Sequence, residues 1–316
     1  MKATQLFFIA GLSLGSFGRH FFNAIYLAPA KHGSSNENKT ISEKRESLKI
    51  DSKLKEFTEL LIESGSDKYY RHHYERYYKR WLSPFRLKSN LTFLEIGADT
   101  GRSLNLWENY FSDPQLLLGL AYSNSGNRVV QAGQRSERVS VFYGDQSRKE
   151  TMNELSKLGP WDIIVDDGSH VPSHVVYTLF EMWNSVKHGG LYVIEDLETN
   201  YWKAGSDIYG YKLGNVGIGA NPKDSAVTKL QQLLDVLVRH QIGATQLSVM
   251  PGDENICAIE WGMNIVLIRK CGSDDGEGPS FLEKNYDNVT MATWIKDARR
   301  TNPRKDKHGN LSPAGW

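Results

Sequence analysis

Two apolar segments of this chain each end abruptly in a pair of acidic residues. Residues 161–167 read Trp-Asp-Ile-Ile-Val-Asp-Asp, and residues 191–196 read Leu-Tyr-Val-Ile-Glu-Asp. Short apolar runs of this kind are typical of strands that are buried on both faces of a parallel sheet. Ligands of open α/β sheets bind in the crevice outside the carboxyl ends of the strands. We therefore expect both acid pairs to line one crevice at that edge.

Segments of strand and helix character alternate through the middle of the chain. The expected strands are 91–96, 116–121, 139–143, 163–165 and 191–194, and the expected helices are 102–111, 125–135, 147–158, 173–186 and 225–240. Two final β segments, 245–250 and 256–270, read as an antiparallel pair that turns near Trp261. Strands separated by helices of this length predict βαβ units. The predicted fold is α/β, a doubly wound, mostly parallel seven-stranded sheet with a C-terminal antiparallel hairpin.

The sequence predicts five regions. They are a signal peptide or signal anchor at 1–30, a polar linker at 31–53, an aromatic-rich helical cap at 54–90, the main domain at 91–271 and a polar C-terminal extension at 272–316. Most aromatic side chains of the cap are expected to pack on the sheet. Residues 204–222 carry five glycines and read as a lid or as a disordered insertion.

The N-terminal region predicts entry into the secretory pathway or a membrane-anchored lumenal position, with organelle targeting or a cytoplasmic location as alternatives. Acceptor sequons at Asn38, Asn90 and Asn288 are compatible with a lumenal protein. The two cysteines, Cys257 and Cys271, form no metal-ligand spacing and no evident disulfide framework. The net charge of +1 gives no indication of a nucleic-acid partner.

The acid pairs and a nearby histidine indicate a divalent-metal site. Asp166 and Asp167 are followed by Gly-Ser and His170, and the second pair is Glu195 and Asp196. Carboxylate oxygens are the ligands that hard cations prefer, and an imidazole beside them is suited to act as a general base. An Asp-Asp-Gly sequence is also common in ordinary turns, so the alternative is a turn without chemistry.

A glycine turn follows the first expected strand. Glu95 and Gly97 precede Asp99 and Gly101, and these glycines allow a tight turn and the close approach of a ligand. The spacing differs from G-x-G-x-x-G, so a dinucleotide is a less suitable ligand. The alternative is a glycine turn capped by Asp99 or Thr100. Asp145, after the third strand, fits either an adenine contact or a helix N-cap.

These motifs together resemble the class I S-adenosylmethionine (SAM)-dependent methyltransferases. Within that class the chain is similar to the metal-dependent O-methyltransferases of macrolide sugars, the mycinamicin and tylosin type. The resemblance covers about residues 65–270. The matching segments are Gly-Ser-Asp-Lys at 65–68 with His73 and Tyr74, Leu-Glu-Ile-Gly at 94–97 with Ser103, Leu104 and Trp107, residues 166–170, and residues 189–197 with Tyr201 and Trp202.

The resemblance implies a Rossmann-like methyltransferase fold and a set of site residues. Asp167, Glu195 and Asp196 would hold Mg²⁺, and His170, with Asp167 beside it, would be the catalytic base. The candidate SAM-binding residues are Glu95, Gly97, Asp99, Gly101, Ser123, Asp145 and Asp166.

One position departs from the pattern of these methyltransferases. They usually carry an acid at the end of the second strand, which binds the ribose hydroxyls, and this chain has Ala121 there. Ser123 or Asn124 is expected to serve as a weaker, uncharged partner. Loss of a charged hydrogen bond weakens binding by roughly 1.5–3 kcal/mol. Weak SAM binding, or none, is therefore an open alternative.

The expected function is Mg²⁺-dependent transfer of the SAM methyl group to a hydroxyl of a sugar or another small hydroxylated acceptor. Two alternatives remain. One is a catalytically inactive binding or scaffold protein with a methyltransferase fold and a possible membrane tether, supported by Ala121. The other is a cephalosporin-hydroxylase-like oxygenase, which requires His174 to reach the metal.

Overall fold

The computed structural model describes residues 55–122, 138–213, 225–239, 247–275, 305 and 307–310. The expected N-terminal signal or anchor and the polar linker lie outside this part of the chain, as do Ser123, the expected helix 125–135 and the sequons at Asn38 and Asn288. Among the helices that the structure does describe, none has the length and apolar character needed to cross a membrane.

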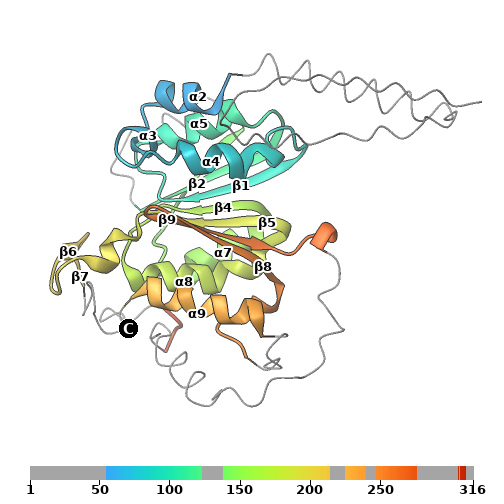
Figure 1. Cartoon of the computed structure of the whole chain (residues 1–316). Coiled ribbons are helices and arrows are strands. Elements are labelled where there is room, and N and C mark those ends of the chain that lie inside the picture. Colours follow the sequence, from blue (N-terminus) through green and yellow to red (C-terminus); the bar gives the residue numbers. More distant parts are fainter. Residues whose placement is uncertain are drawn as a thin grey trace, which may run out of the picture. The chain divides into compact units, whose positions relative to one another are not determined.

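A seven-stranded sheet forms the centre of the main body (Figure 1). The strand order is β3-β2-β1-β4-β5-β9-β8. The strands are β1 (Leu91–Ile96), β2 (Pro114–Ala121), β3 (Val139–Tyr143), β4 (Trp161–Asp166), β5 (Val186–Ile194), β8 (Ile256–Gly262) and β9 (Ile265–Lys270). The first five run parallel, and β9 pairs antiparallel with both β5 and β8. The predicted doubly wound fold class is confirmed.

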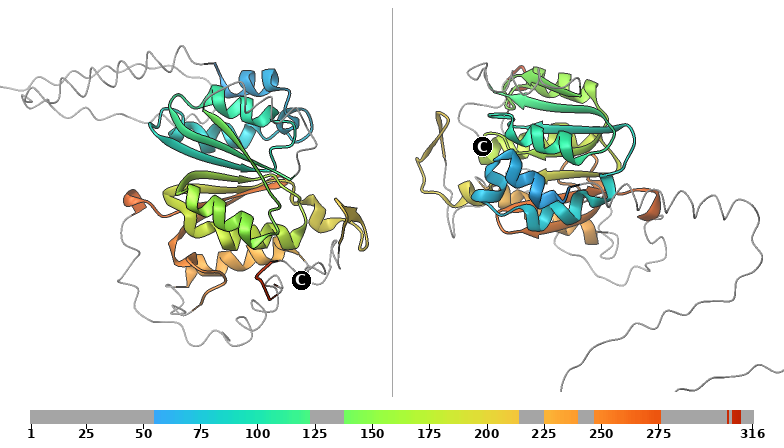
Figure 2. Two further views of the ribbon diagram at one scale, coloured as in Figure 1. Left: turned by 180° about the vertical axis from the view of Figure 1, so that it is seen from behind. Right: turned by 90° about the horizontal axis from the view of Figure 1, so that it is seen from above.

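Helices cover both faces of the sheet, as the views from behind and above also show (Figure 2). One layer contains α2 (Phe57–Ser64), α3 (Asp67–Tyr70), α4 (Glu75–Leu82) and α5 (Arg102–Tyr110), and the other contains α7 (Lys149–Leu158), α8 (Pro172–Met182) and α9 (Ala226–Val238). Short 3-10 helices are η1 (Ser83–Phe85), η2 (Trp183–Ser185), η3 (Leu197–Tyr201), η5 (Asp253–Asn255) and η6 (Ser273–Asp275).

Each layer has its own apolar core against the sheet. Phe57, Tyr78 and Trp107 bring α2, α4 and α5 together over one face, and their rings lie 5.4–6.2 Å apart. On the opposite face, α7, α8 and α9 pack on the alternate side chains of the strands. Strands buried on both faces need apolar residues at successive positions, which explains Ile163, Ile164 and Val165 in β4.

The C-terminal hairpin differs from the expected one. Both of its strands, β8 and β9, come from the second predicted segment, and the chain turns at Met263 and Asn264. Residues 247–250, the described part of the first predicted segment, form no strand. The backbone N–H groups of Val249 and Met250 donate to Asp253 Oδ2 at 2.5 and 3.0 Å, so a carboxylate takes the hydrogen bonds that a neighbouring strand would accept.

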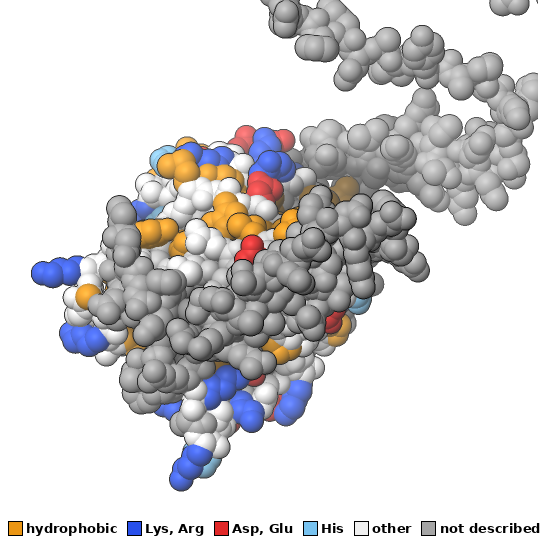
Figure 3. All heavy atoms as spheres, turned by 60° about the horizontal axis from the view of Figure 1, so that its bottom comes forward, with side chains coloured by type: hydrophobic (Ala, Val, Ile, Leu, Met, Phe, Trp, Pro, Cys, Tyr) orange, Lys and Arg blue, Asp and Glu red, His pale blue; other side chains and the backbone are white. Residues whose placement is uncertain are grey.

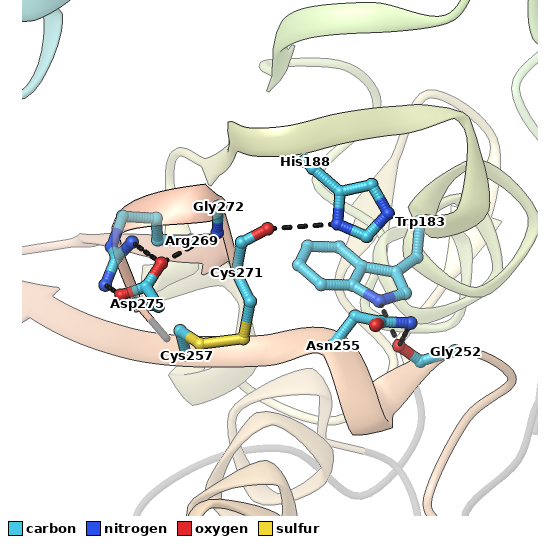
Figure 4. Close-up of a disulfide and its surroundings, with 9 residues drawn as sticks. All are labelled: Trp183, His188, Gly252, Asn255, Cys257, Arg269, Cys271, Gly272 and Asp275. Carbon is cyan, nitrogen blue, oxygen red and sulfur yellow. Dashed lines mark hydrogen bonds and ion pairs between the residues drawn. A yellow bond between two sulfur atoms is a disulfide. The ribbon is translucent and has the colours of Figure 1, made fainter. Parts of the chain in front are cut away.

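The cysteines are also paired, contrary to the expectation of no disulfide framework. Cys257 and Cys271 form a disulfide across β8 and the end of β9 (Figure 4). The pairing depends on the antiparallel register of β8 and β9, which a separation of 14 residues does not reveal. Gly189 N–H donates to the Cys271 carbonyl at 3.0 Å, so the disulfide lies at the amino end of β5.

A second, two-stranded sheet was not predicted. β6 (Asp207–Ile208) and β7 (Tyr211–Lys212) form a small hairpin within the glycine-rich segment. Ile208 and Leu213 pack on Val171, just before α8. The described part of this segment is therefore ordered structure beside the carboxyl ends of the strands (Figure 1).

Candidate active site

The two acid pairs meet at one edge of the sheet because their strands are neighbours in register. Asp166 pairs with Ile96 of β1 and with Ile194 of β5. Beyond the strands, the Asp167 N–H donates to the Ile96 carbonyl at 2.8 Å, and the Glu195 N–H donates to the Asp166 carbonyl at 3.0 Å. The two acid pairs thus lie at the carboxyl ends of two neighbouring parallel strands, β4 and β5, as their sequence positions predict.

Asp167, His170 and Asp196 converge on one point. One ligand atom from each lies within 4.8 Å of the others. His170 Nε2 is 3.9 Å from Asp167 Oδ1 and 3.7 Å from Asp196 Oδ2. His170 and Asp196 have positive φ angles of 57° and 55°, a conformation that non-glycine residues adopt rarely and that is concentrated at functional sites. Thr199 Oγ1 donates to the His170 carbonyl at 2.6 Å and supports this turn.

Each of the two aspartates divides its oxygens between two environments. Asp167 Oδ2 accepts from Lys68 Nζ at 2.5 Å, and Asp196 Oδ1 accepts from the Tyr74 hydroxyl at 2.6 Å. The other oxygen of each faces His170. Two carboxylate oxygens held apart from the protein's own donors, next to an imidazole, suit a hard divalent cation.

Glu195 lies deeper than its neighbour Asp196. It is 2% exposed, and its Oε1 accepts from Lys68 Nζ at 2.8 Å and from the Tyr78 hydroxyl. Burial, with repulsion from Asp167, raises the pKa of Glu195 well above its ordinary value. The closely spaced cluster therefore contains His170 beside the two aspartates, with Glu195 behind Asp167 and joined to it through Lys68.

The helical cap supplies three site residues that sequence reasoning treated as packing or assigned no role. They are Lys68 of α3, Tyr74, which precedes α4, and Tyr78 of α4. The spacing of four residues places Tyr74 and Tyr78 on one side of a helical turn, toward Asp196 and Glu195. Lys68 and Tyr74 belong to the motifs that carry the family resemblance, and this was the available signal.

On the donor side, Glu95 is fully buried beneath the glycine turn. Its Oε2 accepts from Ser103 Oγ at 2.6 Å, and its Oε1 is 3.4 Å from Lys68 Nζ. Burial raises the pKa of Glu95, and the nearby Lys68 opposes this effect. The hydrogen bond between Glu95 and Ser103 therefore joins the two elements that flank the glycine turn, β1 and α5.

The glycine turn touches the acid-bearing turn directly. Gly97 has a φ of 98°, and a Cβ there would lie 1.9 Å from the carbonyl oxygen of Asp167. Gly101, at φ 74°, precedes the first residue of α5. Asp99 also adopts a positive φ, of 33°. The turn that is expected to hold the donor and the turn that carries Asp167 are thus in backbone contact.

Two further predicted residues lie in other surroundings. The Asp166 side chain points to the opposite face of the sheet, where Gln146 Nε2 lies 3.3 Å from its Oδ1, and burial raises the pKa of Asp166 to about 7. Asp145 Oδ1 accepts from the Ser147 N–H at 2.8 Å, which closes a local turn. The N-cap of α7 is Arg148, so the helix-cap alternative for Asp145 is wrong.

His174 does not join the cluster. Its Nδ1 lies 2.8 Å from Ser169 Oγ, and its ring packs edge-on against Tyr211 of the β6–β7 hairpin. Burial lowers the pKa of His174 to about 4. The second histidine that an oxygenase site would require is therefore engaged elsewhere.

Aromatic side chains surround the crevice. Tyr201 and Trp202 follow Asp196 along the chain and are 52% and 42% exposed, and Tyr209 at the tip of the β6–β7 hairpin is 73% exposed. Partial burial and the charges of Asp99, Asp167 and Asp196 raise the pKa of Tyr209, so this phenol lies within electrostatic range of the site. Such a rim suits an acceptor that has apolar faces beside its hydroxyl groups.

On the described part of the face shown in Figure 3, basic side chains are scattered around the rim and are not gathered into one continuous patch. This pattern agrees with the near-neutral net charge of the chain.

No family model matches the chain, but curated relatives do. The 8-demethyl-8-alpha-L-rhamnosyl tetracenomycin-C 2'-O-methyltransferase of Streptomyces olivaceus is 30% identical over 234 residues, covering 71% of this chain and 57% of the relative. The mycinamicin VI 2''-O-methyltransferase of Micromonospora griseorubida is 26% identical, covering 70% and 53%. The demethylmacrocin O-methyltransferase of Streptomyces fradiae is 28% identical, covering 72% and 55%.

A solved structure is similar throughout the main body. The MycE methyltransferase from the mycinamycin biosynthetic pathway, in complex with Mg, SAH and mycinamycin VI, superimposes with a TM-score of 0.58 at 25% identity, covering 77% of this chain and 60% of that one. The chain therefore has the fold of these methyltransferases, and the resemblance indicated by the motifs is confirmed. It spans little more than half the length of the curated relatives it matches.

Proposed function

We propose that this chain is a Mg²⁺-dependent, SAM-dependent O-methyltransferase that acts on a sugar hydroxyl of a small glycosylated acceptor. The observation that carries the proposal is the convergence of Asp167, His170 and Asp196 beside the glycine turn at the carboxyl edge of the sheet. The relatives named above, which methylate such compounds according to their names, support the reaction type and the acceptor class.

Asp167, Asp196 and Glu195 would hold Mg²⁺. The fit rests on the outward oxygens of the two aspartates and on the hard-oxygen donor set. When bound, the ion supplies Lewis acidity that favours the alkoxide form of an acceptor hydroxyl. Glu195 completes the set from a position that Lys68 and Tyr78 hold in place.

His170 is the proposed general base. It takes the proton of the acceptor hydroxyl at Nε2, the nitrogen that faces both aspartates. SAM, when bound, would supply a methyl group for the acceptor oxygen, and its sulfur would leave with the electron pair of the broken bond. The crevice contributes by aligning the two reactants.

Glu95, Gly97, Asp99 and Gly101 would hold the donor at the first turn. The buried carboxylate of Glu95 and the left-handed glycines shape this turn. Ser123 is the proposed partner for the ribose and lies outside the described residues. Asp145 and Asp166 have a more indirect role, because Asp145 closes a local turn and the Asp166 side chain contacts Gln146.

The acceptor pocket is proposed to lie among Tyr201, Trp202 and Tyr209. These exposed aromatic side chains follow Asp196 or come from the β6–β7 hairpin. An aromatic face can pack against the apolar face of a sugar ring while the hydroxyls point to the metal.

Calorimetry tests this function. The chain is titrated with SAM in the presence of Mg²⁺ and in excess EDTA, and methyl transfer from labelled SAM to rhamnosylated tetracenomycin-type and mycinamicin-type acceptors is followed under both conditions. SAM binding with Mg²⁺-dependent transfer is expected. Full transfer in EDTA would contradict the metal role.

A non-catalytic binding protein is the second candidate, because Ala121 ends β2 where an acid would bind the ribose. It predicts no measurable SAM binding in the same titration. SAM binding without transfer to any acceptor of the panel would support a different acceptor class.

We also propose that the chain resides in an oxidising compartment, as the N-terminal sequence predicts. The disulfide supports this location, because structural disulfides persist mainly in secreted and lumenal proteins. Alkylation of the native chain before and after reduction tests it, since free thiols before reduction would contradict it.

A further inference from the structure

Lys68 is the cation around which the site acids are arranged. It is 1% exposed, and its Nζ lies 2.5 Å from Asp167 Oδ2, 2.8 Å from Glu195 Oε1 and 3.4 Å from Glu95 Oε1. Asp167 and Glu195 follow β4 and β5, Glu95 lies within β1, and Lys68 comes from the cap. One side chain of the cap thus contacts acids from three neighbouring strands.

The geometry also places a second cap residue on the same oxygen. The Tyr78 hydroxyl donates to Glu195 Oε1, which Lys68 contacts as well. Without these donors, the buried carboxylates of Glu95 and Glu195 and the nearby carboxylate of Asp167 would repel one another. Buried carboxylates without partners are strongly destabilised, so the cap residues determine how these acids are arranged.

We propose that Lys68, assisted by Tyr78, is a positioning residue that holds Asp167 and Glu195 in the arrangement that binds the divalent ion. The inference rests on the proposed function, because it assigns the ion to these carboxylates. It makes the helical cap an integral part of the active site.

If Lys68 acted only through its charge, its removal would strengthen the binding of the divalent ion. Removing a cation beside anionic ligands strengthens the electrostatic attraction for a divalent ion. Positioning predicts weaker binding, because the groups that orient metal ligands typically contribute 10–100-fold to metal affinity. The direction of the change in affinity therefore separates the two roles.

The test is a titration of the full chain with Mn²⁺, in which free Mn²⁺ is followed by electron paramagnetic resonance and Mg²⁺ serves as the competitor. The wild-type chain is compared with Lys68→Met, which keeps the length of the side chain, and with Tyr78→Phe, which keeps the ring. We expect Lys68→Met to weaken Mn²⁺ binding at least tenfold and Tyr78→Phe to weaken it severalfold.

The matched control is Lys187→Met. Lys187 Nζ lies 2.8 Å from Asp162 Oδ2, the same distance as from Lys68 Nζ to Glu195 Oε1. This variant therefore removes a comparable lysine–carboxylate pair at the other end of β4. Its Mn²⁺ affinity should equal that of the wild type. Circular dichroism verifies the fold of each variant, and Tyr78→Phe carries the test if Lys68→Met does not fold.

The outcomes are distinguishable. Unchanged or tighter Mn²⁺ binding in a folded Lys68→Met variant overturns the positioning role. If Lys68→Met does not fold, unchanged Mn²⁺ binding in Tyr78→Phe overturns it. Either result leaves the proposed function intact. A wild-type chain that binds no Mn²⁺ overturns the metal site itself and the role of Lys68 with it.

Discussion

Single aspartates at this site each serve two partners. Asp167 directs one oxygen to Lys68 and the other toward His170, and Asp196 does the same between Tyr74 and His170. A carboxylate that is already hydrogen-bonded on one side is restricted in its rotation. The site is therefore largely preorganised, which reduces the entropy lost when a ligand binds.

Replacing His170 with alanine tests the base at this scale. Because a positioned general base contributes about 10²–10⁴-fold, His170→Ala should lower turnover by roughly that factor. SAM affinity should stay unchanged, since the imidazole faces the aspartates and not the glycine turn. Rates of labelled methyl transfer and calorimetry measure both quantities. His188→Ala, at an exposed position, is the control, and equal turnover in both variants would eliminate His170 as the base.

The positions of the acids could be predicted from the sequence, but their partners could not. Asp167 and Asp196 follow buried strands, and strand order brings such residues together. Lys68 meets Glu195 across 127 positions of the chain, and its place in a motif of the family resemblance was the one signal that set it apart from a surface lysine. The contact of Tyr78 with the same acid is equally non-local, so its helix suggested only packing.

Among the elements, the parallel strands and their helices were predictable because each shows a clear apolar pattern. The segment 247–250 shows why the pattern alone is insufficient. Its apolar residues Leu247, Val249 and Met250 are buried, as in a strand. Its backbone nevertheless bonds to Asp253, which a buried ion pair with Arg239 at 2.9 Å holds in place. Such a tertiary contact overrides the local preference for a strand.

The β8–β9 hairpin gives a prediction about stability. A disulfide that closes a loop of about 15 residues stabilises a chain by roughly 3 kcal/mol in the chain-entropy description. The double variant Cys257→Ser, Cys271→Ser should lower the free energy of unfolding by about that amount, as measured by urea denaturation. SAM affinity should be retained, because the disulfide lies at the end of β5 away from the site. A large loss of SAM affinity would contradict this separation.

For the whole molecule, the two helical layers have unequal roles. The layer of α7, α8 and α9 encloses an apolar core, and the layer of α2, α4 and α5 encloses another while the cap also contributes side chains to the site. The order of layers follows from alternating strands and helices. The chemical contribution of the cap does not, because it depends on how the cap docks on the sheet.

One buried histidine makes a separable contribution to the pH dependence of stability. Burial lowers the pKa of His174 to about 4 in the folded chain, below its ordinary value of 6.5. At this residue the unfolded chain binds more protons between these values, so the contribution of His174 to the free energy of unfolding falls as the pH drops from about 6.5 to 4. The contribution is present above pH 6.5 and amounts to roughly 3 kcal/mol.

Urea denaturation at pH 7 and pH 4 measures this effect. Compared with the wild type, His174→Gln should reduce the free energy of unfolding at pH 7 relative to that at pH 4 by about 3 kcal/mol, and His188→Gln, at an exposed position, should leave the difference unchanged. An unaltered difference in the His174 variant would show that other groups cause the acid sensitivity.

Gly97 brings the two parts of the proposed active site into close backbone contact. A methyl group at this position would overlap the carbonyl of Asp167, so the two loops share a single van der Waals boundary. A substitution that displaces one loop must displace the other. Donor affinity and metal affinity are therefore expected to change together in laboratory evolution, and selection for one property alone should avoid this position.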